Sequence, residues 1–202
     1  MSEDVRAREQ TLSPAAARGV LFASERTGPI PAPAAPEDAE LLVLKRLSSR
    51  AARAIDFALE HDDGQNPNDL DDAEVIVIAP SRCGKTPTSM YLALQYGLRV
   101  ANHPMTEEDV VSGRLPRAVL SHLGRCIGLT SNARRLSQVR HERRIDSRYA
   151  SVEQCALELR QAEELYARNR IPFLNSATAS VEEISVAIWR VVQERARTTP
   201  AQ

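Results

Sequence analysis

The stretch VIVIAPSRCGKTPTSMYLALQYG, residues 75–97, joins a short apolar run to a helical pattern through Gly-Lys-Thr. The run Glu74–Ala79 is rich in β-branched residues, which is typical of a strand buried on both faces of a sheet. Apolar residues then continue at helical spacing over Met90–Tyr96. A strand, a tight turn and a helix in this order are the local pattern of a phosphate-binding loop.

The turn resembles the motif G-x-x-x-x-G-K-[ST] in the frame from Ala79 to Thr86. The predicted nucleotide-binding residues are Ala79, Pro80, Ser81, Arg82, Cys83, Gly84, Lys85 and Thr86. In such a loop the backbone N–H groups and the helix N-terminus surround an anion. Lys85 is expected to neutralise the outer phosphates, and the hydroxyl of Thr86 is the predicted Mg²⁺ ligand.

Two residues depart from an ideal phosphate-binding loop. Ala79 stands where the motif has glycine, and a positive φ at this position would cost alanine roughly 1 kcal/mol or more. Pro80 removes one amide donor. The alternative interpretation is an ordinary strand–turn–helix that happens to contain Gly-Lys-Thr. No later predicted strand ends in Asp, which argues against a motor ATPase or a GTPase switch.

Segments on both sides of the loop predict the rest of the fold. Apolar residues at helical spacing predict a helix over Glu37–Glu60, followed by a turn-rich acidic loop, His61–Asp72. Short apolar runs predict three further strands at Leu98–Ala101, Cys126–Leu129 and Ile171–Ser176.

Helices are predicted between these strands. The segment 131–144 has helical character, and two later helices begin with capping boxes, Ser151 with Gln154 and Ser180 with Glu183. Strands that alternate with helices indicate a parallel sheet. The predicted fold class is therefore α/β, with a P-loop-type parallel sheet flanked by helices.

Composition divides the chain and limits its partners. Residues 1–36 are rich in proline and alanine and are predicted to be disordered. Residues 37–64 form a leading helix and turn, and residues 65–196 form the α/β domain. The net charge of -1 gives no reason to expect nucleic acid as a partner. The absence of a long apolar segment predicts no membrane partner, and three scattered cysteines favour reduced thiols in the cytoplasm.

Several segments together carry a family resemblance: HDDGQNPNDLDDAEVIVIAPSRCGKTPTS, YLALQYGLRVAN, GLT, SRYAS, IPFLNS and SVEEIS. In this order they resemble the phosphoenolpyruvate synthase regulatory proteins, relatives of the pyruvate, phosphate dikinase regulatory proteins. The match runs from about Arg50 to Val192. The family carries a substantial domain before this region, where this chain has its Pro/Ala-rich segment, so we expect a truncated product or a shortened paralogue.

The resemblance implies a bifunctional serine/threonine kinase and pyrophosphorylase. It implies ADP as the donor that phosphorylates and inactivates the synthase or dikinase, and inorganic phosphate as the acceptor in the reverse reaction, which releases pyrophosphate. It also singles out Arg143 and Arg148 as residues that stabilise the transferring charge. A homo-oligomer is compatible with the sequence.

Several interpretations stay open. Asp62 or Asp63 orients Mg²⁺ or accepts the threonine proton; alternatively, His61 and Gly64 merely end a helix. The other arginines of residues 131–148 are interpreted as a solvated, salt-bridged face. Rival functions are a P-loop kinase for a small metabolite and a chain that binds nucleotide or the synthase without catalysis.

A helix N-terminus lowers the pKa of a nearby thiol, so Cys83 is either activated in this way or simply fills space in the loop. The structure can decide between these two interpretations.

Overall fold

The computed structural model of the protein describes residues 47–66, 69–144 and 147–198. The predicted disordered segment, residues 1–36, lies outside the described residues, as does the first part of the predicted leading helix.

Four parallel strands form one sheet in the order β2-β1-β3-β4. The strands are β1 (Val75–Ala79), β2 (Val100–Pro104), β3 (Cys126–Thr130) and β4 (Phe173–Asn175). All five residues of β1 are buried, as its apolar run predicted, and all five residues of β3 are buried as well. The predicted α/β class with a parallel sheet flanked by helices is confirmed.

The strand β2 begins later than the predicted Leu98, at Val100, and ends later than the predicted Ala101, at Pro104. Its last three residues, Asn102, His103 and Pro104, pair with residues 77–79 of β1. Asparagine and proline are uncommon in strands, so their sequence favours a loop. Tertiary pairing with a central strand outweighs this local preference.

Seven α-helices and four single turns surround the sheet in the described part of the chain. The helices are α2 (Ala52–Glu60), α3 (Lys85–Tyr96), α4 (Glu107–Ser112), α5 (Arg117–Leu120), α6 (Ala133–His141), α7 (Val152–Arg168) and α8 (Val181–Thr198). The turns are η3 (Leu47–Ala51), η4 (Asp62–Gly64), η5 (Leu123–Arg125) and η6 (Arg148–Ala150). The predicted end of the leading helix at Glu60 is confirmed, whereas α4 and α5 were not predicted.

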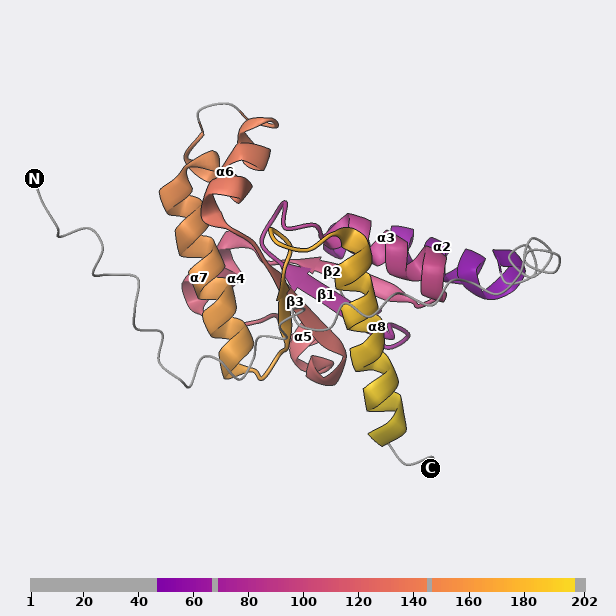
Figure 1. The fold of residues 1–202 in the computed structure, drawn as a ribbon. Helices are drawn as coiled ribbons and strands as arrows, with labels where there is room; N and C mark the ends of the chain where they lie inside the picture. Colours follow the sequence, from indigo (N-terminus) through magenta and orange to yellow (C-terminus); the bar gives the residue numbers. More distant parts are fainter. Residues whose placement is uncertain (1–46, 67–68, 145–146, 199–202) are drawn as a thin grey trace, which may run out of the picture.

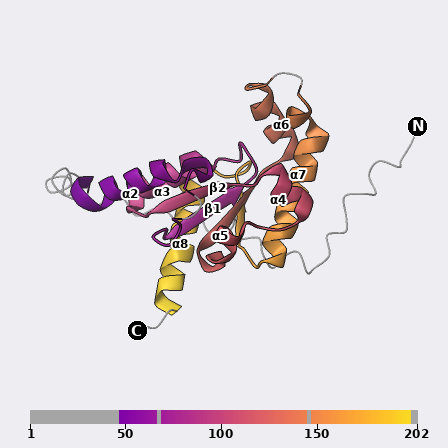
Figure 2. The same ribbon diagram turned by 180° about the vertical axis from the view of Figure 1, so that it is seen from behind.

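The helices cover both faces of the sheet (Figures 1 and 2). Alternate residues of β1 point to opposite faces. Ile76 and Ile78 pack in a cluster with residues of α5 and α7. Val75 and Val77 pack in a second cluster with residues of α3 and α8. In Figure 1, α8 crosses in front of the strands, and α2 lies outside α3. This three-layer arrangement explains why β1 carries no charge.

Capping confirms one predicted helix start fully and another in part. At α8 the Ser180 amide donates to Glu183 Oε2 at 2.8 Å, and the Glu183 amide donates to Ser180 Oγ at 3.2 Å. At α7 the Ser151 hydroxyl accepts from the Gln154 amide at 3.2 Å. The reciprocal bond expected from Gln154 is replaced, because its side chain donates to Glu158 at 2.9 Å.

The strand order places the candidate site. The chain leaves β1 through α3 to reach β2 on one side, and β3 lies on the other side of β1. In open parallel sheets, ligands collect at the carboxyl edge where the strand order reverses in this way. The loops that follow β1, β3 and β4 therefore meet at one edge.

Candidate active site

The loop between β1 and α3, residues Pro80–Gly84, turns sharply at this edge. The Cys83 amide donates to the Pro80 carbonyl at 3.4 Å. Arg82 and Gly84 have φ values of 72° and 88°. Glycine adopts this left-handed conformation freely, whereas Arg82 bears a cost of roughly 1–2 kcal/mol. Backbone turns of this kind bring N–H groups toward one concave face, and the N-terminus of α3 adds partial positive charge there.

The strain expected at Ala79 does not occur. Ala79 is the last residue of β1, pairs with Pro104, and accepts the Met105 amide at 3.0 Å. Its φ is not positive. The glycine of the motif is therefore not required at this position, since the left-handed backbone lies further along the loop.

The side chain of Lys85 is held inside the loop. Lys85 is 5% exposed, and its Nζ donates to the Pro80 carbonyl at 3.5 Å. The same nitrogen lies 3.7 Å from Oδ1 of Asp63. Burial lowers the pKa of Lys85, and the neighbouring carboxylate of Asp63 opposes that shift. An ammonium group in this position suits an anion in the loop.

Two adjacent carboxylates reach the loop from η4. Thr86 Oγ1 donates to Asp62 Oδ1 at 2.8 Å, and the side-chain amide of Asn102 donates to the same oxygen. The Asp63 amide donates to Asn102 Oδ1 at 2.7 Å. Asp62 is thus fixed by its partners, whereas the side chain of Asp63 is 64% exposed. The sequence had not indicated Asn102, which fixes both residues from β2.

His61 supports the turn η4, which carries Asp62 and Asp63. The residue is buried, with Nδ1 2.9 Å from the Phe57 carbonyl oxygen and Nε2 2.8 Å from that of Asp69. Its ring stacks on Phe57 at 3.9 Å. Gly64 has a φ of 72°, which suits glycine. His61 and Gly64 thus have a structural role after the end of α2, as in the alternative interpretation, while the carboxylates of Asp62 and Asp63 face the loop.

A buried arginine fixes the loop from the other side. Arg140 of α6 donates from Nη2 to the Ser81 carbonyl at 3.1 Å and from Nη1 to the Tyr149 carbonyl at 2.9 Å. It also pairs with Glu158 at 2.6 Å and lies 4.1 Å from the centre of the Tyr149 ring. The Tyr149 hydroxyl donates to Ser81 Oγ at 2.9 Å. Ser81 is therefore held by both its backbone and its side chain, directly before the left-handed Arg82.

The interpretation of Arg140 as part of a solvated face is wrong, because its side chain is fully buried. Arg143 and Arg148 are exposed. Neither forms an ion pair with any residue described in the structure. Arg143 and Arg148 thus lie on the surface in the free chain, and the arginine that reaches the loop is Arg140.

Arg140→Ala is expected to lower the free energy of unfolding by about 3–5 kcal/mol, because it leaves Glu158 and the Ser81 carbonyl without their partner. Urea denaturation measures this change. Arg144→Ala removes an exposed arginine nearby and should change stability by less than about 0.5 kcal/mol. Equal effects of the two variants would contradict the proposed support of the loop by Arg140.

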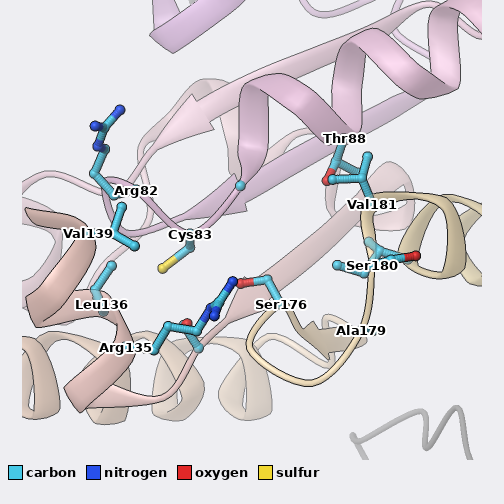
Figure 3. Close-up of a pocket in the computed structure, with 13 residues that line it drawn as sticks. Arg82, Cys83, Thr88, Arg135, Leu136, Val139, Ser176, Ala179, Ser180 and Val181 are labelled. Carbon is cyan, nitrogen blue, oxygen red and sulfur yellow. The ribbon is translucent and has the colours of Figure 1, made fainter.

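A pocket of about 260 Å³ opens beside the loop (Figure 3). It is lined by residues of three loops that follow strands and by the adjoining helices. These residues include Cys83, Gly84, Ser131, Leu136, Ser176 and Ser180. In Figure 3 the side chain of Arg135 points toward Ser176, while Arg82 points away from the pocket.

The thiol of Cys83 is not activated by the helix N-terminus. The residue is 1% exposed, and burial raises its pKa to about 12, although Lys85 and Arg140 act in the opposite direction. The structure therefore favours the space-filling interpretation of Cys83.

The raised pKa of Cys83 predicts an inert thiol in the folded protein. Between pH 7 and about pH 10 the group stays protonated, since its pKa lies well above the ordinary value of 9.0. Iodoacetamide should not label Cys83 within the time that labels the urea-unfolded chain completely, as mass spectrometry can show. Rapid labelling of the folded chain below pH 8 would show that this thiol is ionised.

No group of three or more His, Cys, Asp or Glu residues in the described ranges is arranged to hold a metal ion. Within those ranges, no helix is long and apolar enough to cross a membrane. The oxygens of Thr86 and Asp62 are nevertheless the ligand type that Mg²⁺ prefers, because this ion commonly combines one or two carboxylates with substrate phosphates.

Comparison with known proteins gives a consistent result. The model of the kinase/pyrophosphorylase family matches residues 34–189. A protein of Legionella pneumophila (strain Corby) named "Putative phosphoenolpyruvate synthase regulatory protein" is 51% identical over 143 residues, which cover 71% of this chain and 53% of that protein. Proteins of the same name from Pseudoalteromonas atlantica and Methylibium petroleiphilum are 52% identical over 136 residues and 49% identical over 140 residues.

Coverage of these two proteins is similar. The matched residues make up 67% and 69% of this chain, and 50% and 52% of the two proteins. The chain thus spans about half the length of the curated relatives it matches.

Proposed function

The chain belongs to the kinase/pyrophosphorylase family, and we propose from this membership that it reversibly phosphorylates a threonine of phosphoenolpyruvate synthase. In the inactivating direction, ADP donates its terminal phosphoryl group to the threonine hydroxyl, and AMP leaves. In the reverse direction, inorganic phosphate takes the phosphoryl group from phosphothreonine, and pyrophosphate leaves. The names of the similar proteins support this choice of target.

The observation that carries the proposal is the meeting of the loop with two carboxylates. Lys85 Nζ lies 3.7 Å from Asp63, and Thr86 donates to Asp62 at 2.8 Å. Phosphoryl transfer depends mainly on positioning and charge neutralisation, together with a base for the attacking hydroxyl. Lys85 neutralises the phosphates, and the exposed carboxylate of Asp63 takes the threonine proton as the threonine oxygen attacks phosphorus.

The same oxygens fit Mg²⁺. The Thr86 hydroxyl and the Asp62 carboxylate would hold the ion, which supplies positive charge next to the phosphates when bound. Arg143 and Arg148 would contribute charge only in a complex with the target protein, because both are exposed in the free chain.

The direct test incubates the purified chain with purified phosphoenolpyruvate synthase, ADP and Mg²⁺, followed by mass spectrometry of the synthase. We expect phosphothreonine on the synthase and AMP in equal amounts. Addition of inorganic phosphate to the phosphorylated synthase should remove the modification and release pyrophosphate.

Two results would contradict the proposal. Transfer from a nucleotide to a small metabolite, with none to the synthase, would indicate a metabolite kinase. Nucleotide binding in a calorimeter without transfer in either direction would indicate a binding protein without catalysis.

A further inference from the structure

The pocket and the carboxylates of Asp62 and Asp63 lie on opposite sides of the loop between β1 and α3. Asp62 is held by Asn102 of β2, whereas Ser131 and Ser176 of the pocket follow β3 and β4. Since β1 lies between β2 and β3, the loop after β1 separates the carboxylates from the pocket. A phosphate chain that lies along the loop would therefore have one end near Asp63 and the other end at the pocket.

The pocket has the chemistry of a site for a small organic group. Leu136, Val139 and Ile184 give it an apolar wall. Thr88 also lines it, and its hydroxyl oxygen is buried and has no hydrogen-bond partner among the described residues. A buried hydroxyl without a partner costs free energy, so a ligand that bonds to it gains affinity. In Figure 3 Thr88 and the cationic Arg135 lie on opposite sides of the pocket.

The volume of the pocket suits a compact ligand. Pockets for drug-sized ligands have volumes of about 300–1,000 Å³. The pocket here measures about 260 Å³ and adjoins Gly84, so it suits a compact organic group joined to phosphates in the loop.

We propose that this pocket binds the nucleoside moiety of the phosphate donor and that it sets the donor's direction along the loop. This inference rests on the proposed function. The nucleoside occupies the β3–β4 side, the phosphates cross the loop amides, and the terminal phosphate reaches Lys85 and Asp63 on the β2 side. The acceptor hydroxyl then approaches from the side of the carboxylates.

In this arrangement the two proposed reactions differ in whether they need the pocket. The ADP-dependent direction needs both the pocket and the loop. The direction that starts with inorganic phosphate needs the loop alone, because neither phosphate nor pyrophosphate carries a nucleoside. A bulky side chain that fills the pocket should therefore weaken the binding of ADP but not that of pyrophosphate.

Ala179→Phe provides the main test, because Ala179 lines the pocket from the connection between β4 and α8. Calorimetric titration should show ADP binding about tenfold or more weaker, while pyrophosphate binding changes less than about threefold. Ala177→Phe adds the same ring two residues earlier, at a position that does not line the pocket, and should leave both affinities near those of the unmodified chain.

Thr88→Val is a second test with a different readout. It replaces the hydroxyl with a methyl group of similar shape. ADP binding should weaken about three- to tenfold, while the melting temperature stays constant or rises, because the hydroxyl has no partner to lose. A merely structural Thr88 would instead show a lower melting temperature and unchanged affinity.

The outcomes distinguish this inference from the proposed function. Equal weakening of ADP and pyrophosphate by Ala179→Phe in a folded variant, or no weakening of either, would overturn the pocket assignment. If the unmodified chain binds neither ligand, both proposals fail. If selective weakening of ADP occurs but the synthase is never phosphorylated, the pocket assignment stands and the proposed function fails.

Discussion

Lys85→Met is expected to abolish phosphoryl transfer in both directions, with a loss of about a thousandfold or more in kcat/KM. Lys85 is a buried cation inside the loop, and both directions place negatively charged oxygens next to it. A neutral side chain of similar length leaves the developing negative charge without its cation. The cost in activation free energy is on the order of several kcal/mol.

Folding of the Lys85→Met variant should survive. Burial lowers the pKa of Lys85, which means that the folded chain holds the ammonium at a cost. Methionine removes this cost and leaves Asp63 largely exposed to solvent. The free energy of unfolding at pH 7 should therefore be equal or higher, as urea denaturation can measure. Arg53→Met, which removes an exposed cation from α2, should retain activity. Comparable activity in both variants would remove Lys85 from the mechanism.

Asp63→Asn is expected to reduce transfer by about 10²–10⁴-fold, because it removes the base for the threonine proton. The backbone should not change, since Asp63 has a φ of 50° and asparagine tolerates this region well. Asp56→Asn, an exposed substitution on α2, serves as the control.

The result that would contradict this role is an Asp63→Asn variant with more than about a third of the normal rate. In that case the carboxylate would only balance the charge of Lys85, which lies 3.7 Å away.

Local patterns in the sequence were sufficient for the core of the fold. The strand Val75–Ala79, the turn and the helix after it are specified by neighbouring residues, as is the capping box of Ser180 and Glu183. Periodicity and capping chemistry act over a few residues, so one sequence can reveal them. The short helices α4 and α5 have only six and four residues, too few for a periodic signal.

Contacts between distant residues could not be predicted in the same way. Arg140 lies 59 positions after Ser81, whose carbonyl it holds. In a segment with many arginines, the sequence does not show which one faces the protein interior. Arg140 is buried because α6 packs against α7, where its partner Glu158 lies.

The position of Asp62 and Asp63 could be predicted only in part. Their position next to the loop was one of two open interpretations, because a turn with aspartates also ends a helix. The contact of Asp62 with Thr86 spans 24 positions, and its third member, Asn102, lies in β2. The parallel pairing of β1 with β2 brings Asn102 next to the end of β1, and the Asn102 amide donates to the carbonyl of His61, the residue before Asp62, at 3.1 Å.

The central claim is that the main-chain amides between Ser81 and Thr86 bind a phosphate beside Lys85. A crystal structure of the chain with pyrophosphate and Mg²⁺ tests it most directly. We expect one phosphate group within hydrogen-bond distance of these amides and of Lys85 Nζ. Pyrophosphate bound elsewhere with the loop empty, or Lys85 turned toward bulk solvent, would contradict the claim.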